Sequence, residues 1–240
     1  MDKKTVIQLL DASIYQYENL VLSGVDVEVQ AGEFIYVVGK VGTGKTTLIK
    51  TLHAELPLYY GTGNVLDFDL VGIKSREIAQ LRRRLGVVFQ DFRLLTDRNV
   101  YNNLAFVLKA TGWKSKLKIE NRVNEVLERV GMSHKKEKQP HQLSGGEQQR
   151  VVIARAILND ADIILADEPT GNLDPETSEE ILDLFIQLNN EGKTILMATH
   201  DYAAIAKKPA RTWVCTNGKV NDSAKNSDEI EFGHLLERNV

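Results

Sequence analysis

Short apolar runs and longer helical stretches divide the chain into segments. Runs at 34–38, 85–89, 163–166 and 194–199 have the length and composition of buried strands. Apolar residues spaced at i, i+3 and i+4 predict helices at 45–55, 100–108, 119–130 and 147–158. The pattern therefore predicts strands separated by helices over most of the chain.

The N-terminal region contains segments with the two-residue period of strands. Val25, Val27 and Val29 alternate with polar residues, which indicates a half-exposed antiparallel strand within a strand region at 5–30. Further along, we expect a turn at Gly61–Gly63, an alternating segment at 64–69 and a basic helix near 76–84.

Residues Gly39–Thr47 match the pattern G-x-x-x-x-G-K-[ST] of a phosphate-binding P-loop, between an apolar run and a helical stretch. Glycines let backbone N–H groups close around phosphate oxygens, and the helix N-terminus adds the positive end of its dipole. Lys45 is expected to reach the β- and γ-phosphates, and the Thr46 hydroxyl to bind Mg²⁺. The expected nucleotide contacts are Gly39, Lys40, Val41, Gly42, Thr43, Gly44, Lys45, Thr46 and Thr47.

Polar residues follow the other apolar runs. Asp167 ends the run at 163–166 as a Walker-B carboxylate does, so we expect it to hold Mg²⁺ directly or through water. Glu168 comes next, where it could polarise an attacking water. Gln90 and His200 each follow the carboxyl end of a strand, where α/β folds bind ligands.

A second Gly-rich helix start lies at Leu143–Arg150, with the sequence Leu-Ser-Gly-Gly-Glu-Gln-Gln-Arg. A serine hydroxyl and the N–H groups of a helix N-terminus together make an anion-binding site. One nucleotide does not need two such loops from one chain, which suggests that Ser144 serves a nucleotide held elsewhere. Tyr15 or Tyr17 could stack on a nucleotide base, although an edge-strand tyrosine without a ligand explains the pattern equally well.

Composition excludes several classes of protein. The 240 residues are 42% hydrophobic and 26% charged with a net charge of -3, so the basic excess of a nucleic-acid binder is missing. The single cysteine, Cys215, excludes a disulfide framework and is expected to be buried on a strand. We find no signal peptide and no apolar run near the ~20 residues of a membrane helix. We therefore expect a cytoplasmic protein that reaches a membrane only through a partner.

The Leu143–Arg150 motif resembles the signature motif of the ABC ATPases, and the resemblance extends from about residue 5 to 222 in the family's motif order. It implies a P-loop NTPase fold with a RecA-like α/β core, an antiparallel β edge and a helical sub-domain at roughly 91–160. The predicted organisation is a single ATP-binding domain at 1–222 followed by a C-terminal tail at 223–240.

The same resemblance assigns roles to individual residues. Gln90 resembles the family's Q-loop residue, which senses the γ-phosphate beside Mg²⁺, so it is expected to contact the metal together with Thr46 and Asp167. Asp174 lies in the segment that resembles the D-loop, and it is expected to contact the nucleotide. His200 resembles the switch histidine that contacts the γ-phosphate, and Glu168 takes the position of the general base. Tyr15 falls near the adenine-stacking aromatic, with Tyr17 as a possible substitute.

These ATPases form head-to-tail homodimers when ATP binds. Each ATP then lies between the P-loop of one subunit and Ser144, Gly145 and Gly146 of the other, which gives two equivalent sites. The γ-phosphate contacts both halves, so hydrolysis reopens the dimer.

Within this family, Phe89–Asn103 resembles the FtsE family of cell-division ATPases through its Phe-Gln-Asp-x-Arg-Leu-Leu and Asp-Arg-x-Val elements. That resemblance implies an integral membrane partner of FtsX type and control of cell-wall hydrolysis from the inner face of the membrane. We expect Phe92, Leu94 and Leu95 to form part of the docking surface. The alternative is the ATPase of a lipoprotein-release or macrolide-export transporter. Val41 departs from these families, which often carry Ser there, but this removes no backbone donor.

Overall fold

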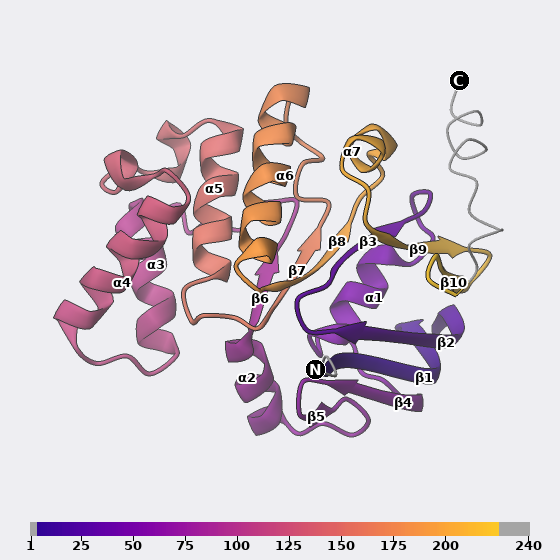
Figure 1. Ribbon diagram of the computed structural model, residues 1–240. Helices are drawn as coiled ribbons and strands as arrows, with labels where there is room; N and C mark the ends of the chain where they lie inside the picture. Colours follow the sequence, from indigo (N-terminus) through magenta and orange to yellow (C-terminus); the bar gives the residue numbers. More distant parts are fainter. Residues whose placement is uncertain (1–3, 226–240) are drawn as a thin grey trace. The chain divides into compact units, whose positions relative to one another are not determined.

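The computed structural model describes residues 4–225 (Figure 1). The chain divides into two compact units. The first unit takes the chain up to Leu81 and again from Leu196, and the second unit runs from Arg82 to Ile195. The helix α2 (Ser75–Arg84) and the strand β8 (Thr194–Ala198) each pass from one unit into the other. None of the helices in the described part of the chain has both the length and the apolar character needed to traverse a lipid bilayer.

The first unit contains most of the strands. Its elements are β1 (Thr5–Gln16), β2 (Asn19–Gln30), β3 (Phe34–Val38), α1 (Lys45–Leu52), β4 (Tyr60–Val65), β5 (Phe68–Asp69), α7 (Tyr202–Lys207), β9 (Arg211–Thr216) and β10 (Lys219–Asp222). One antiparallel sheet has the strand order β2-β1-β4-β5 (Figure 1). In the other, β9 lies between β3, with which it pairs in parallel, and β10, with which it pairs antiparallel.

Several predictions for the first unit are confirmed. The strand region at 5–30 is the hairpin β1–β2, and Val25, Val27 and Val29 are buried while Asp26 is exposed. The basic helix predicted near 76–84 is α2. Cys215 is buried on β9, and burial raises the pKa of its thiol to about 12.

The turn predicted at Gly61–Gly63 is wrong, because these residues lie inside β4, where Thr62 pairs with Leu10 and Gly63 with Leu9 of β1. Gly61 instead permits a close approach of two backbones: a Cβ atom there would lie 2.4 Å from the carbonyl oxygen of Asp11. The register of β1 shifts between Leu10 and Ser13, so this contact accompanies a bulge. The alternating segment predicted at 64–69 is likewise interrupted by the turn between β4 and β5.

The second unit contains most of the helices. Its elements are β6 (Leu85–Val88), α3 (Val100–Ala110), α4 (Lys116–Arg129), the 3-10 turns η1 (Ser133–Lys135) and η2 (Pro140–Gln142), α5 (Gly145–Ala156), β7 (Ile163–Asp167) and α6 (Pro175–Asn190). The helices α3, α4 and α5 pack against one another (Figure 1) and correspond to the three predicted after residue 99. They lie in the range predicted for the helical sub-domain. The domain boundary near 222 stays a prediction, and residues 226–240 of the predicted tail lie outside the described residues.

The sequence interpretation missed α6, although its start carries a recognisable signal. Asp174 is its N-cap, and the Asp174 carboxylate accepts a hydrogen bond from the Thr177 N–H at 3.0 Å. Pro175 follows at the first helical position, where a missing N–H costs nothing.

Arg211 ties the two sheets of the first unit together. Its guanidinium contacts the carboxylates of Glu33 at 2.8 Å and Asp222 at 2.5 Å, and it donates to the carbonyl of Glu28 at 2.8 Å. Burial alone would raise the pKa of the Asp222 carboxyl, but hydrogen bonds from Arg211 and from the Ala224 N–H lower it overall. Because the pKa is lower in the folded state, this carboxylate stabilises the fold above its unfolded pKa. The contribution is lost as the pH falls through the folded pKa.

We therefore predict that Asp222→Asn lowers the free energy of unfolding by about 1–3 kcal/mol at pH 7. The difference from the wild type should shrink in acid, because the wild-type carboxyl is then protonated as well. Urea unfolding of both proteins at pH 7 and in steps toward pH 3 measures this. Asp67→Asn, which removes an exposed ion pair with Lys4, is the matched control and should cost less than about 1 kcal/mol. A difference that grows in acid would contradict the assignment.

Candidate functional site

The P-loop residues connect β3 to α1, and glycine is required at both ends of the loop. Gly39 has a φ of 150°, and a Cβ atom there would lie 2.4 Å from the carbonyl oxygen of Cys215. Gly44 has a φ of 101°, and its Cβ would lie 2.8 Å from the side chain of Val21. Among the described residues no side chain caps α1, and its first turn contains no acidic residue. The positive end of α1 is therefore presented to an anion.

Lys45 lies inside this loop. Its side chain is only 4% exposed, and its ammonium group donates to the carbonyl oxygens of Gly39 at 2.8 Å and Lys40 at 3.3 Å. The Thr43 hydroxyl donates to the same Lys40 carbonyl at 2.8 Å. The loop thus holds a cation at its centre, where a phosphate group would be bound.

The other P-loop residues differ in what they present. Thr46 is exposed on the first turn of α1, which fits the metal-binding role predicted for its hydroxyl, whereas Thr47 is buried. The Val41 side chain is 89% exposed, so the departure from Ser at this position changes the outer surface of the loop.

His200 lies at the carboxyl end of β8, within the first unit. The N–H of Thr199 donates to the carbonyl of Val37 at 3.0 Å, so His200 leaves the sheet next to the strand that leads into the P-loop. The Thr199 hydroxyl accepts from the N–H of Asp201, which in turn caps α7. The exposed imidazole is therefore carried by a backbone fixed on both sides.

In the second unit, Gln90 and the two acidic residues lie at one edge. The strands β6 and β7 are parallel with Val88 opposite Ala166, so the residues after each strand emerge at the same edge. Asp167 ends β7, and Glu168 follows with a φ of 47°, in the left-handed region that non-glycine residues rarely adopt. Such backbone strain is typical of functional positions.

The Gln90 side chain is held against the segment that resembles the D-loop. Its Nε2 atom lies 3.5 Å from the Asn172 Oδ1 atom, and the Asn172 amide donates to the Gln90 carbonyl at 3.3 Å. A Cβ atom at Gly171 would lie 2.9 Å from the Gln90 amide nitrogen. The amide is thus packed against Gly171 and Asn172.

Ser144 is the N-cap of α5 and forms a capping box with Glu147. The Ser144 Oγ atom accepts from the Glu147 N–H at 3.2 Å, and the Glu147 carboxylate accepts from the Ser144 N–H at 2.9 Å. This N–H and the Lys135 ammonium lower the pKa of Glu147. Ser-x-x-Glu is the recognised sequence signal of this capping role of Glu147, which was not predicted above. The Ser144 hydroxyl keeps its O–H for donation to an anion.

The two glycines after Ser144 allow α5 to approach the start of α6. A Cβ atom at Gly146 would lie 2.3 Å from the Thr177 Cγ2 atom, and one at Gly145 would lie 3.1 Å from the Leu173 side chain. Asp174 caps α6 at this contact, and hydrogen bonds from Thr177 lower the pKa of its carboxyl. The structure therefore shows Asp174 as a helix cap, while a contact with nucleotide stays a prediction.

The segment after Gln90 is supported from beneath by Arg155 on α5. Phe92 and Arg93 both have left-handed backbones, with φ of 52° and 50°, and their carbonyls accept from the Arg155 guanidinium at 2.9 Å and 2.6 Å. Asn103 fixes the other end by bonding both the N–H and the carbonyl of Leu95. Leu95 is 38% exposed, and Phe92 and Leu94 are half-buried. No local sequence signal indicates the part played by Arg155.

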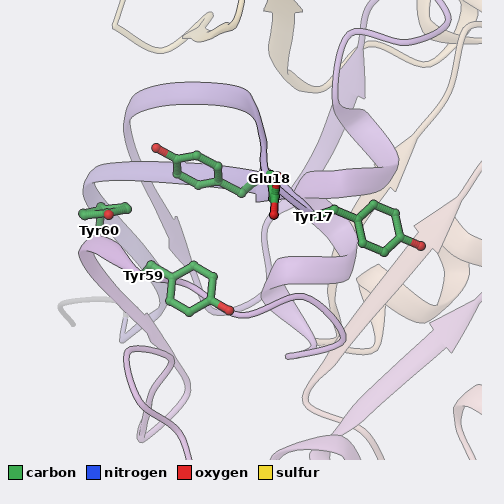
Figure 2. Close-up of a pocket in the computed structure, with 5 residues that line it drawn as sticks. Tyr17, Glu18, Tyr59 and Tyr60 are labelled. Atoms are coloured by element: carbon green, nitrogen blue, oxygen red, sulfur yellow. The ribbon is translucent and has the colours of Figure 1, made fainter.

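The two tyrosines weighed for base stacking lie in one pocket of the first unit. Tyr15, Tyr17, Glu18, Tyr59 and Tyr60 line this cavity of about 500 Å³ (Figure 2). The rings of Tyr15 and Tyr60 have their centroids 5.8 Å apart. The sequence interpretation missed Tyr59 and Tyr60, which follow α1 and lie far from Tyr15 along the chain.

The close contact at Gly146 leads to a prediction about stability. Gly146→Ala places a methyl group against the Thr177 Cγ2 atom and should lower the free energy of unfolding by about 1–3 kcal/mol, despite the better helix propensity of alanine. Thr177→Ser removes that Cγ2 atom and keeps the hydroxyl, so the double variant should regain most of the loss. Thermal and urea unfolding of the two single variants and the double variant measure it. Additive losses in the double variant would argue against the contact.

The chain matches one protein family and is similar to proteins of known name. A family model described as "ABC transporter" matches residues 22–171. The chain is 43% identical over 232 residues to the "Cell division ATP-binding protein FtsE" of Streptococcus pneumoniae serotype 2 (strain D39), covering 96% of this chain and 99% of that protein. It is 49% identical over 180 residues to the protein of the same name from Bacillus subtilis (strain 168), covering 75% of this chain and 78% of that protein.

A solved structure is similar over nearly the whole chain. It is a dimeric, post-hydrolysis state of the ATP-binding cassette MJ0796 bound to ADP and Pi. Its sequence is 31% identical, the TM-score is 0.79, and the alignment covers 90% of this chain and 96% of that one.

Proposed function

Because the chain belongs to the ABC transporter family, we propose that it is the ATP-hydrolysing subunit of an FtsE-type complex that acts in cell division. The fold is that of a P-loop NTPase of the ABC ATPase type. The observation that carries ATP binding is the buried Lys45 ammonium at the centre of the P-loop. The cell-division role is supported by the likeness to the FtsE relatives, which extends over 96% of this chain.

We assign nucleotide binding to residues of the first unit. The Lys45 ammonium exchanges its bonds to the Gly39 and Lys40 carbonyls for bonds to the β- and γ-phosphates. The N–H groups at the start of α1 bind phosphate oxygens, and Tyr15 stacks on the base. His200 contacts the γ-phosphate.

Hydrolysis is assigned to residues of the second unit. Glu168 accepts the proton of the attacking water, and Gln90 senses the γ-phosphate through the segment it contacts at Asn172. The reaction is an in-line displacement at the γ-phosphorus. The main catalytic contribution of the side chains is therefore to position the attacking water.

Mg²⁺ suits the oxygen donors available here. The described residues contain no group of three or more His, Cys, Asp or Glu side chains able to hold a metal ion. Beside nucleotides, Mg²⁺ is usually held by a hydroxyl, one carboxylate, water and phosphate oxygens. In the proposed complex, Thr46 would supply the hydroxyl and Asp167 the carboxylate. When bound, the ion neutralises charge that develops on the phosphates.

A second copy of the chain completes each site. Ser144, Gly145 and Gly146 begin α5 with an O–H and backbone N–H groups suited to phosphate oxygens. We propose a head-to-tail homodimer in which this helix start meets the nucleotide of the partner, supported by the dimeric state of the similar MJ0796 cassette.

Coupling to the membrane is assigned to the segment after Gln90. Phe92, Leu94 and Leu95 dock an integral membrane partner of FtsX type, which holds the protein on the inner face of the membrane. The support is an apolar segment in a loop fixed by Arg155 and Asn103 and partly open to solvent.

The role of Glu168 can be tested directly. Glu168→Gln should bind ATP with near-normal affinity, hydrolyse it at least about 100-fold more slowly, and accumulate as a dimer in ATP, because the proton acceptor is lost and the closed state persists. Phosphate release and size-exclusion chromatography measure these effects. Lys45→Ala is the comparison variant and should lose ATP affinity instead. Near-normal turnover by Glu168→Gln would remove Glu168 from the role of base.

The docking surface predicts a separable defect. Leu95→Glu and Phe92→Glu should abolish co-purification with the membrane partner from detergent extracts, while ATP affinity stays unchanged. Leu117→Glu is the matched control, because Leu117 is an exposed apolar residue (67%) on α4 of the same unit. Retained co-purification would exclude the surface. A recovered partner of the lipoprotein-release or export type would favour that alternative over cell division.

A further inference from the structure

The tyrosine pocket is built by local features of the β-sheet and not by chance exposure of aromatic residues. Tyr60 lies opposite Ser13 in the β1–β4 pairing, so Tyr15, two residues on, is its diagonal neighbour on the same face. The bulge of β1 opposite Gly61 sets this geometry, because it re-aims the residues that follow Asp11. Tyr60 thus supports the Tyr15 ring from the side.

The hairpin between β1 and β2 brings two further residues to the pocket. Gln16 pairs with Asn19, which leaves Tyr17 and Glu18 as a two-residue turn. Tyr17 has a φ of 57° at the first turn position, where glycine is the usual residue. Residues with an unfavourable backbone conformation cluster at functional sites, so the positive φ of Tyr17 points to a functional role of this turn.

Glu18 brings the one ionisable carboxylate among the residues that line the pocket. In the view of Figure 2, its side chain lies between those of Tyr59 and Tyr17. Among the described residues it takes part in no hydrogen bond or ion pair. The acceptor oxygens of this carboxylate are therefore available to a ligand held between the tyrosines.

We propose that Glu18 selects the base of the bound nucleotide by accepting a hydrogen bond from the exocyclic amino group of adenine. The inference rests on the proposed base site at Tyr15 and adds a specificity residue to it. Aromatic stacking tolerates any base, because every base has a π-face. A carboxylate, by contrast, pairs with the N6 amino group of adenine, a donor, and repels an oxygen acceptor at the same position.

The contribution is measured by comparing nucleotides that differ at the 6-position of the purine, with inosine also carrying a proton on N1. Purine riboside triphosphate lacks the amino group, and inosine triphosphate carries an oxygen there. We expect the wild-type chain to bind ATP about five- to tenfold more tightly than purine riboside triphosphate, as for one charge-assisted hydrogen bond near solvent. Inosine triphosphate should bind more weakly still.

Variants at position 18 should change these ratios in different ways. Glu18→Ala should bring the ATP to purine riboside triphosphate ratio to within about twofold of unity. Glu18→Gln keeps a carbonyl acceptor and gains an amide donor, so it should retain part of that preference while relaxing the discrimination against inosine triphosphate. Asn19→Ala, on the same hairpin but outside the pocket lining, is the matched control and should keep the wild-type ratios.

Equilibrium titration calorimetry of the full chain without added Mg²⁺, which prevents turnover, gives the dissociation constants. Ratios cancel any general effect of removing a negative charge on polyphosphate affinity. An unchanged ratio in Glu18→Ala overturns the proposal, as does tighter binding of GTP than ATP by the wild type. Tyr15→Ala tests the base site at Tyr15 separately from the specificity role of Glu18. If it weakens all the nucleotides equally, the base site stands and Glu18 is judged alone; if it weakens none, the base site itself is wrong, and the proposal with it.

Discussion

Burial of the Lys45 ammonium is the constraint on which the phosphate-binding loop depends. A buried cation is costly unless oxygen atoms surround it, and here the carbonyls of Gly39 and Lys40 supply them. The backbone of the loop adopts positive φ at Gly39 and at Gly44, which glycine permits. The same positions leave no room for a side chain, since β9 and β2 lie within contact distance of them. The loop is therefore organised for a polyanion by the packing of the strands around it.

The second unit uses close packing in a different way. Gly146 allows α5 to touch Thr177 at the start of α6, and Arg155 on α5 holds the carbonyls of Phe92 and Arg93. The helix α5 thus contacts both the segment after Gln90 and the start of α6. A shift of α5 would displace both contacts, because closely packed elements move together as rigid bodies and do not deform gradually. A shift at the start of α5 would therefore reach the segment after Gln90, which is the proposed docking surface.

Much of this arrangement could be predicted from the sequence, and the misses have common physical causes. Apolar periodicity gave β3, β6, β7 and β8 and the helices α1 and α3 to α5, because those elements bury one face or a whole strand. The error at Gly61–Gly63 arose because glycine serves both turns and close backbone approaches, and the bulge that decides between them lies in β1, about fifty residues earlier. Arg155, Tyr59 and Tyr60 act through contacts between distant segments, which no local pattern contains.

The two helix starts also differ in how strongly each attracts an anion. The first turn of α1 has no acidic residue and holds Lys45, whereas the first turn of α5 contains Glu147, whose lowered pKa keeps it ionised. A carboxylate there offsets part of the positive helix end, so α5 alone is a weak site for a free polyphosphate. It would bind well only to a phosphate whose charge another group already neutralises. In a nucleotide bound by a second copy, the P-loop lysine of that copy neutralises part of the phosphate charge. Loss of the γ-phosphate would remove the group that α5 binds. In the proposed dimer, the weakness of this second anion site would make closure conditional on ATP.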